Sequence, residues 1–147
     1  MKAKNNKISL STPFIDFNEK KLILDSIKNN EISTYGRNVS VFEKNVAKLS
    51  GGKYNLAVNS GSSALLIAFK SIGLKKEDLV ITQSYTFTAT TNSIIHSGGT
   101  PWLFDIDSEN LSIDVDKVRE KLVKDCFKKG KFYFHKITKK RVFAICP

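Results

Sequence analysis

The N-terminal part of the chain contains two stretches in which apolar residues recur every three or four positions, the spacing of an amphipathic helix. The first stretch follows Asp16 and Asn18, either of which can cap a helix. The second starts with Ser40 and Glu43, which have the S-x-x-E spacing of a capping box, and ends at the glycine pair 51–52. Both stretches therefore predict helices.

Short apolar runs alternate with helical stretches along the rest of the chain. The runs predict strands at residues 54–58, 79–82, 102–106, 132–134 and 142–146. Helices are predicted from the serines at 60–63 to Gly73, from Thr86 to His96, and after the cap Asp114. Strands separated by helices form βαβ units, so we expect one largely parallel α/β sheet that holds both strand 54–58 and strand 142–146.

Composition limits the class of protein. The chain has 147 residues, 41% of them hydrophobic and 26% charged, which is typical of one globular domain and not of a disordered chain. No apolar run approaches the roughly 20 residues of a membrane-spanning helix, and the N-terminus lacks the apolar core of a signal peptide. We therefore expect a cytoplasmic protein without a membrane partner. Cys126, Cys146 and two histidines predict neither a disulfide framework nor a metal site.

The net charge of +10 is concentrated in one segment. Residues 117–141 hold eleven basic and two acidic residues, a local charge of +9, and the rest of the chain carries +1. We interpret this segment as the solvated surface of a helix and a hairpin. The alternative is a basic binding module, which the aromatic residues at 127 and 132–134 would help. No recognised nucleic-acid motif accompanies them, so we predict no nucleic-acid partner.

The most informative motif is a predicted strand, then Ser60-Gly61-Ser62-Ser63, then a helix. The start of a helix offers unpaired N–H groups and the positive end of the helix dipole, which together favour an anion. Gly61 permits a tight turn and a close approach of the backbone, and Ser62 and Ser63 add hydroxyl donors. This chemistry suits a phosphate monoester. Ordinary helix capping explains the same residue types, so both interpretations remain open at this point.

Several linked segments surround that motif. They read STYGR at 33–37, VFE at 41–43, AVNSGSSAL at 57–65, DLVITQSYTFTATTN at 78–92, GGTPWLFDID at 98–107 and LSID at 111–114. In order and in spacing they resemble the DegT/DnrJ/EryC1/StrS family, the pyridoxal-phosphate-dependent sugar aminotransferases of fold type I. The resemblance covers about residues 14–118, and the basic segment 119–141 matches only weakly.

The resemblance implies a fold and a cofactor. It implies that residues 1–147 form the N-terminal part of a three-layer α/β/α large domain that binds pyridoxal 5'-phosphate. By position, the cofactor-binding residues would be Gly61, Ser62, Ser63, Phe87 and Asn92. In the family, Ser62 and Ser63 stand where the phosphate binds, Phe87 where an aromatic ring stacks on the pyridine, and Asn92 near the cofactor. Plain core packing is the alternative for Phe87.

The resemblance also implies partners. Family members transfer an amino group from an amino acid, glutamate by family habit, to a keto sugar nucleotide for amino-sugar and cell-surface polysaccharide biosynthesis. They are homodimers whose active sites form at the subunit interface. Thr34 and Gly36 would lie in the loop close to the sugar nucleotide, and an ordinary turn is the alternative for both.

No catalytic residue is predicted within this chain. The family's cofactor-binding lysine, and the acidic residue that pairs with the pyridine nitrogen, lie downstream of the segment that residues 142–147 resemble. We therefore expect a fragment that is inactive alone. The alternative is a small domain of which strand 142–146 is the last strand. A dehydratase relative, in which a histidine replaces that lysine, is the alternative activity.

Overall fold

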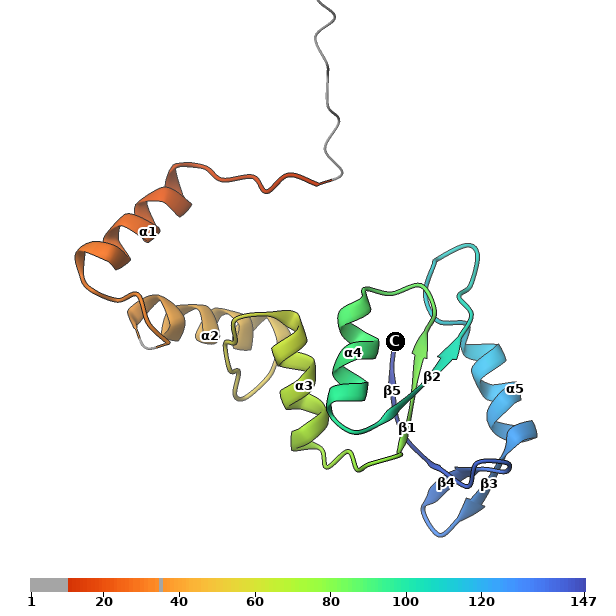
Figure 1. Cartoon of the computed structure of the whole chain (residues 1–147). Helices are drawn as coiled ribbons and strands as arrows, with labels where there is room; N and C mark the ends of the chain where they lie inside the picture. The colour runs from red at the N-terminus through yellow and green to blue at the C-terminus, as the bar shows by residue number, and fades with distance from the viewer. Residues whose placement is uncertain (1–10, 35) are drawn as a thin grey trace, which may run out of the picture. The chain divides into compact units, whose positions relative to one another are not determined.

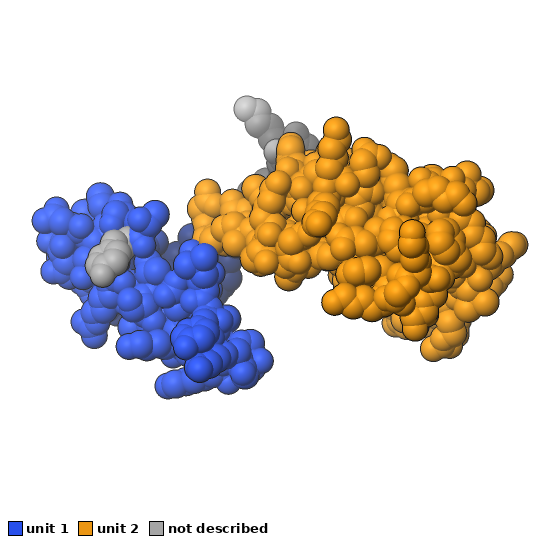
Figure 2. All heavy atoms as spheres, turned by 90° about the horizontal axis from the view of Figure 1, so that it is seen from below, with its two compact units in different colours: residues 1–57 blue, residues 58–147 orange. Residues whose placement is uncertain are grey.

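The computed structural model describes residues 11–34 and 36–147 and divides the chain into unit 1, residues 1–57, and unit 2, residues 58–147 (Figure 2). In chain order the described helices are α1 (Phe17–Lys28), α2 (Arg37–Ser50), α3 (Gly61–Ser71), α4 (Thr88–His96) and α5 (Val115–Asp125). The described strands are β1 (Leu79–Gln83), β2 (Thr100–Phe104), β3 (Cys126–Lys129), β4 (Phe132–His135) and β5 (Arg141–Cys146), as Figure 1 shows.

The first helix of unit 1 begins where the sequence predicts it. Asp16 is the cap, and its carboxylate accepts a hydrogen bond from the backbone N–H of Asn18 at 2.6 Å. Glu19 completes a capping box, because its carboxylate accepts from the N–H of Asp16 at 2.9 Å. Two of the unpaired donors at the start of α1 are thus satisfied by local side chains.

The second helix of unit 1 begins before the predicted capping box. Its cap is Gly36, which has extended backbone, and it ends at Gly51 in the left-handed conformation (φ 69°), as the sequence predicts. Ser40 lies inside the helix. The carboxylate of Glu43 accepts from the N–H of Ala57 at 2.8 Å. The predicted capping box is therefore wrong, because Glu43 bonds to a distant backbone group instead of to the start of its own helix.

Unit 2 is built on one five-stranded sheet with the order β2-β1-β5-β4-β3. Strands β2, β1 and β5 are parallel neighbours, whereas β3 and β4 form an antiparallel hairpin that pairs with the first residues of β5. The sheet is therefore mixed. The expected parallel arrangement is confirmed for three strands, and the hairpin extends it with antiparallel pairing.

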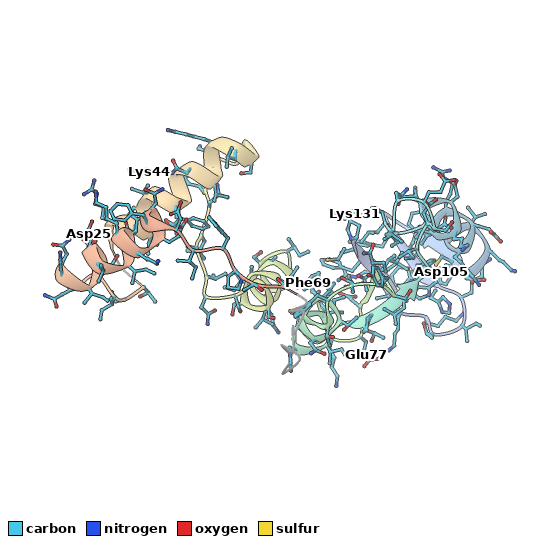
Figure 3. All side chains as sticks on the ribbon, turned by 90° about the horizontal axis from the view of Figure 1, so that it is seen from above. Asp25, Lys44, Phe69, Glu77, Asp105 and Lys131 are labelled. Atoms are coloured by element: carbon cyan, nitrogen blue, oxygen red, sulfur yellow. The ribbon has the colours of Figure 1, made fainter. Side chains whose placement is uncertain are left out.

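Helices cover both faces of this sheet (Figures 1 and 3). Successive side chains of a strand point to opposite faces. Val80 accordingly packs with Phe69 and Ile94, from α3 and α4, while its neighbour Ile81 packs with Val118 of α5. Val80 and Ile81 are both 0% exposed. This confirms the three-layer α/β/α architecture and places the core of unit 2 around β1.

The predicted strand 54–58 is wrong. In the described part of the chain these residues have no strand neighbour, and Leu56 is 71% exposed. A strand needs a hydrogen-bonded partner, which an apolar run in the sequence does not supply. The predicted strand 102–106 is shifted: β2 ends at Phe104, and Ile106 forms an isolated bridge with Ile113.

An ion pair joins Asp78, a buried residue directly before β1, to Arg141, the partly buried first residue of β5. The Arg141 guanidinium donates to both carboxylate oxygens of Asp78, with Nε 2.8 Å from Oδ1, and the N–H of Lys75 also donates to that carboxylate. Arg141 lies over the rings of Phe132 and Phe143, at 4.9 Å and 4.5 Å. Burial opposes the charge on Asp78, yet the bonds from Arg141 and Lys75 lower its pKa below the ordinary value.

Candidate functional site

The start of α3 is the centre of the predicted site. Ser60 caps the helix, and its Oγ accepts from the N–H of Ser63 at 3.2 Å. The hydroxyl of Ser63 donates to Oδ1 of Asn59 at 2.7 Å, so both donors of Ser63 are already used within the loop. Across residues 11–34 and 36–147, the N–H groups of Gly61 and Ser62 have no acceptor. Capping therefore uses Ser60 and Ser63, and the N–H groups of Gly61 and Ser62 remain free within those ranges.

The backbone at Gly61 is open to an incoming group. A Cβ added at Gly61 would meet no atom within 4 Å. Its φ is not positive, so the turn does not require glycine. Of the two roles expected of Gly61, the structure supports close approach to the backbone and not a tight turn. A ligand can therefore reach the free N–H groups and the positive end of the helix dipole.

A buried serine on the neighbouring helix holds this loop in place. The hydroxyl of Ser93, on α4, donates to the carbonyl oxygen of Ser62 at 3.1 Å. Ser93 is 3% exposed, and α3 and α4 pack side by side. Sequence reasoning missed Ser93. The only available signal was a hydroxyl residue directly before the apolar pair Ile94 and Ile95, and this signal does not name its partner.

Phe87 occupies the cap position of α4 and is 83% exposed. Core packing, the alternative considered for this ring, is therefore wrong, and its face is free for a ligand. The starts of α3 and α4 lie toward the edge at which β1 ends (Figure 1). In open α/β sheets ligands bind beyond this carboxyl edge. Asn92 is exposed on α4, and its side chain makes no hydrogen bond within the described ranges.

One buried hydroxyl near that edge has no partner. Thr82, in β1, is 0% exposed, and its Oγ1 has no hydrogen-bond partner in the part of the chain that the structure describes. Gln83 follows it and ends the strand, and the loop to Phe87 begins there. A buried hydroxyl without a partner among the described residues costs stability at the carboxyl edge of β1.

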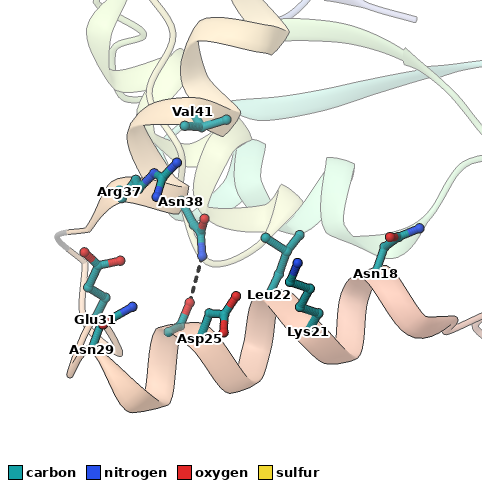
Figure 4. Close-up of a pocket in the computed structure, with 10 residues that line it drawn as sticks. Asn18, Lys21, Leu22, Asp25, Asn29, Glu31, Arg37, Asn38 and Val41 are labelled. Carbon is teal, nitrogen blue, oxygen red and sulfur yellow. Dashed lines mark hydrogen bonds between the residues drawn. The ribbon is translucent and has the colours of Figure 1, made fainter.

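Thr34 and Gly36 lie in unit 1 on a hollow of about 560 Å³. A second hollow of about 510 Å³ lies between α1 and α2, where Asn38 donates to Ser26 at 2.8 Å (Figure 4). Its charged lining is balanced, since it holds two basic residues, Lys21 and Arg37, and two acidic residues, Asp25 and Glu31. The charges of this second hollow therefore do not select an anion, in contrast to the start of α3.

Other kinds of site find little support. Within the described residues no group of three or more His, Cys, Asp or Glu side chains could hold a metal ion. Cys126 and Cys146 are free, and burial raises the pKa of both thiols, so neither is an activated nucleophile. No helix in the described ranges is long and apolar enough to cross a membrane.

Comparison with known proteins relates these observations to a family. The sequence profile of the DegT/DnrJ/EryC1/StrS aminotransferase family matches residues 13–128. The spore coat polysaccharide biosynthesis protein SpsC of Bacillus subtilis is 37% identical over 118 residues, 80% of this chain and 30% of that protein. GDP-perosamine synthase of Caulobacter vibrioides is 36% identical over 112 residues, 76% of this chain and 30% of that protein.

A solved structure also resembles this chain. The Escherichia coli GDP-4-keto-6-deoxy-D-mannose-3-dehydratase with bound hydrated pyridoxal phosphate superposes with a TM-score of 0.67 and 29% identity, over 76% of this chain and 30% of that one. The chain thus spans about 30% of the length of the curated relatives SpsC and GDP-perosamine synthase. The family profile covers the predicted site at the start of α3 and both helices that form it. The chain belongs to the DegT/DnrJ/EryC1/StrS aminotransferase family.

Proposed function

We propose that this chain forms the cofactor-phosphate-binding part of a pyridoxal-phosphate-dependent aminotransferase that transfers an amino group to a keto sugar nucleotide. The observation that carries the proposal is the pair of free N–H groups at Gly61 and Ser62, at an open helix start. Polysaccharide biosynthesis by SpsC, a GDP-sugar product in perosamine synthase, and pyridoxal phosphate in the dehydratase support the same chemistry.

The residues present fit this cofactor. A phosphate dianion needs several donors and a positive field, which Gly61, the hydroxyl and N–H of Ser62, and the dipole of α3 can supply. The planar ring needs a flat apolar surface, which the exposed face of Phe87 offers. Pyridoxal phosphate, when bound, acts as the electron sink of amino-group transfer. The part of this chain is to hold the phosphate and to orient the ring.

Ser93 is proposed as a positioning residue for the same site. Its hydroxyl fixes the carbonyl of Ser62 and with it the first turn of α3. A small displacement of that turn would misdirect both free N–H groups, because hydrogen bonds weaken steeply with angle. Asn92 and Ser63 remain proposed cofactor neighbours, with Ser63 contributing through the loop that it braces.

The substrates and the assembly are part of the proposal. We propose a keto sugar nucleotide as acceptor, an amino acid such as glutamate as donor, a homodimeric enzyme and a cytoplasmic location. Thr34 and Gly36, on their hollow in unit 1, are proposed contacts of the sugar nucleotide. The family membership of the chain and the printed names of its relatives support these assignments.

A sugar dehydratase is the second candidate function. The observation in its favour is the 29% identity to the E. coli dehydratase, at a TM-score of 0.67. Both candidates need the same phosphate site, so a binding test cannot separate them. The product of the whole enzyme separates the two candidates. An aminotransferase leaves a new amino group on the sugar, whereas the dehydratase product has lost water and gained no nitrogen.

The binding experiment uses pyridoxamine 5'-phosphate. This ligand carries an amine in place of the aldehyde and does not label the many surface lysines. Ser62→Asp should weaken its binding about tenfold or more, because a carboxylate repels the phosphate. An acidic residue in the first turn also stabilises a helix, so the loss cannot come from unfolding of α3.

The matched control is Ser71→Asp, at the other end of the same helix. It makes the same change of charge and should leave the affinity within about twofold, since it is far from the proposed phosphate. Equal losses in both variants, or no loss in either, would contradict the phosphate site. Inorganic phosphate should compete with the ligand in the unmodified chain.

A further inference from the structure

The positive charge of residues 117–141 is less evenly spread than the sequence indicates. Five basic residues of this segment have carboxylate partners: Lys117 with Asp105 and Asp114, Arg119 with Asp116, Lys121 with Asp125, Lys140 with Glu77, and Arg141 with Asp78. The other six have none among the described residues, and all six are exposed. They are Lys124, Lys128, Lys129, Lys131, Lys136 and Lys139, here called the lysine patch.

The lysine patch surrounds the β3–β4 hairpin on both faces, because Lys128 and Lys129 are successive residues of β3, and it lies away from the proposed cofactor site. The hairpin joins the sheet through Tyr133 opposite Val142 and Phe134 opposite Arg141, at the first residues of β5. Because β5 is parallel to β1, this is the amino end of the parallel strands, opposite the edge where Phe87 lies. The family profile ends at residue 128, so most of the hairpin lies beyond it.

We propose that the lysine patch binds the anionic surface of a lipid bilayer. This inference concerns a second surface and does not rest on the proposed function. It differs from the expectation, drawn from sequence alone, that the protein has no membrane partner. Clusters of four to eight uncompensated basic side chains are attracted to anionic headgroups, with roughly 1 kcal/mol for each lysine near the surface.

The chemistry of the patch favours lipid over nucleic acid. All six members are lysines, which act as point charges and lack the planar fork by which arginine grips single phosphates and bases. Stacking of bases needs free aromatic faces. Here Lys139 lies over one face of the Phe127 ring at 5.5 Å and Arg141 over one face of the Phe132 ring at 4.9 Å, which leaves Tyr133, 46% exposed, as the exposed ring of the described hairpin without a cation over it.

An exposed apolar side chain lies within the patch. Ile137 is 86% exposed in the turn between β4 and β5, between Lys136 and Lys139. A large apolar residue surrounded by lysines can enter the boundary between headgroups and acyl chains while the ammonium groups stay at the phosphates. The turn therefore combines the two terms that hold peripheral proteins on membranes, electrostatic attraction and local apolar insertion.

Vesicle sedimentation of the full chain tests the proposal. Vesicles of phosphatidylcholine mixed with phosphatidylglycerol should bind the chain, and vesicles of phosphatidylcholine alone should not. Binding should weaken as salt is raised, because screening shortens the range of the attraction. The triple variant Lys128→Gln, Lys129→Gln, Lys131→Gln should lose about a hundredfold in affinity.

Two controls separate a local patch from general basicity. The triple variant Lys20→Gln, Lys44→Gln, Lys48→Gln removes the same charge from exposed positions of unit 1 and should retain most of the binding. Ile137→Ser should weaken binding several-fold, and Ile32→Ser, at another exposed isoleucine, should not.

Three results would overturn the proposal. Equal losses in the two triple variants would show that net charge alone drives binding. Equal binding to neutral and anionic vesicles would exclude an electrostatic surface. Tighter binding to a single-stranded RNA oligonucleotide than to anionic vesicles, at the same salt concentration, would assign the patch to nucleic acid instead.

Discussion

Units 1 and 2 contain the same kinds of apolar side chain, but only unit 2 buries them. In the described residues of unit 1 nothing is buried, and Leu22 of α1 and Phe42 of α2 are more than half exposed. In unit 2, Val80, Ile81 and Ile94 are completely buried. The described helices of unit 1 have the amphipathic pattern, and the described residues of unit 1 form no sheet of their own. A pattern in the sequence is thus enough to predict a helix and not enough to give it a core.

The proposed cofactor contacts and the proposed substrate contacts lie in different units. The proposed phosphate-binding loop begins α3, whose other end packs into the core through Phe69, and Ser93 of α4 donates a hydrogen bond to this loop. Thr34 and Gly36 belong to the unit without buried residues. We therefore expect a preorganised phosphate site in unit 2 and a substrate loop in unit 1 whose order depends on further contacts.

The largest expected effect is in amide hydrogen exchange. Amides of β1, such as those of Val80 and Ile81, should exchange at least about a thousandfold more slowly than amides in the middle of α1 and α2, because buried strands open only with global unfolding. Exchange measured residue by residue on the full chain checks this. Similar protection in both units would show that unit 1 has a core as stable as that of unit 2.

A second contrast comes from matched truncations. Ile94→Ala should lower the free energy of unfolding by about 3 kcal/mol, since it leaves a cavity between α4 and β1. Leu22→Ala, on the exposed face of α1, should cost about 0.5 kcal/mol or less. Urea denaturation followed by circular dichroism measures both. A larger cost at Leu22 would show that unit 1 has a core of its own.

Loss of the ion pair between Asp78 and Arg141 should lower the free energy of unfolding about as much as Ile94→Ala does. Asp78→Asn should cost about 3 kcal/mol, because it leaves the partly buried guanidinium of Arg141 without its charge partner. Asp105→Asn breaks a solvent-exposed pair with Lys117 and should cost much less.

The same pair predicts a dependence of stability on pH. The pKa of Asp78 is lowered in the folded chain, so its contribution is fully present above the ordinary value of 3.8 and is lost as pH falls through the lowered folded value. The Asp78→Asn variant should lack this part of the acid dependence. A thermal unfolding series at acidic pH, in which both proteins lost stability equally, would contradict this assignment.

The smallest effect compares two serines. Ser60→Ala removes the cap of α3 and should cost about 1 kcal/mol. Ser40→Ala, at the wrongly predicted capping box, should be close to neutral, because Gly36 is the cap of α2. Chemical denaturation of the two variants checks the order. A larger cost at Ser40 would restore the capping box.

What the sequence predicts well is local, and what it misses depends on distant partners. Asp16, Gly51 and Asp114 each act on groups within a few residues, so their roles as caps follow from spacing alone. The strand at 54–58 was wrong because pairing is decided by a neighbouring strand. Ser93 was missed because its acceptor lies 31 residues away. The motif at residues 60–63 could be predicted from the sequence, and the hydrogen bond from Ser93 that supports it could not.

The start of α3 is the proposed binding site of the cofactor phosphate. Nuclear magnetic resonance of the ¹⁵N-labelled chain, titrated with pyridoxamine 5'-phosphate and separately with pyridoxamine, tests it most directly. We expect the phosphorylated ligand to cause its largest amide shifts at Gly61 and Ser62, and pyridoxamine to leave both nearly unchanged. Largest shifts in the lysine patch, or equal shifts with both ligands, would contradict it.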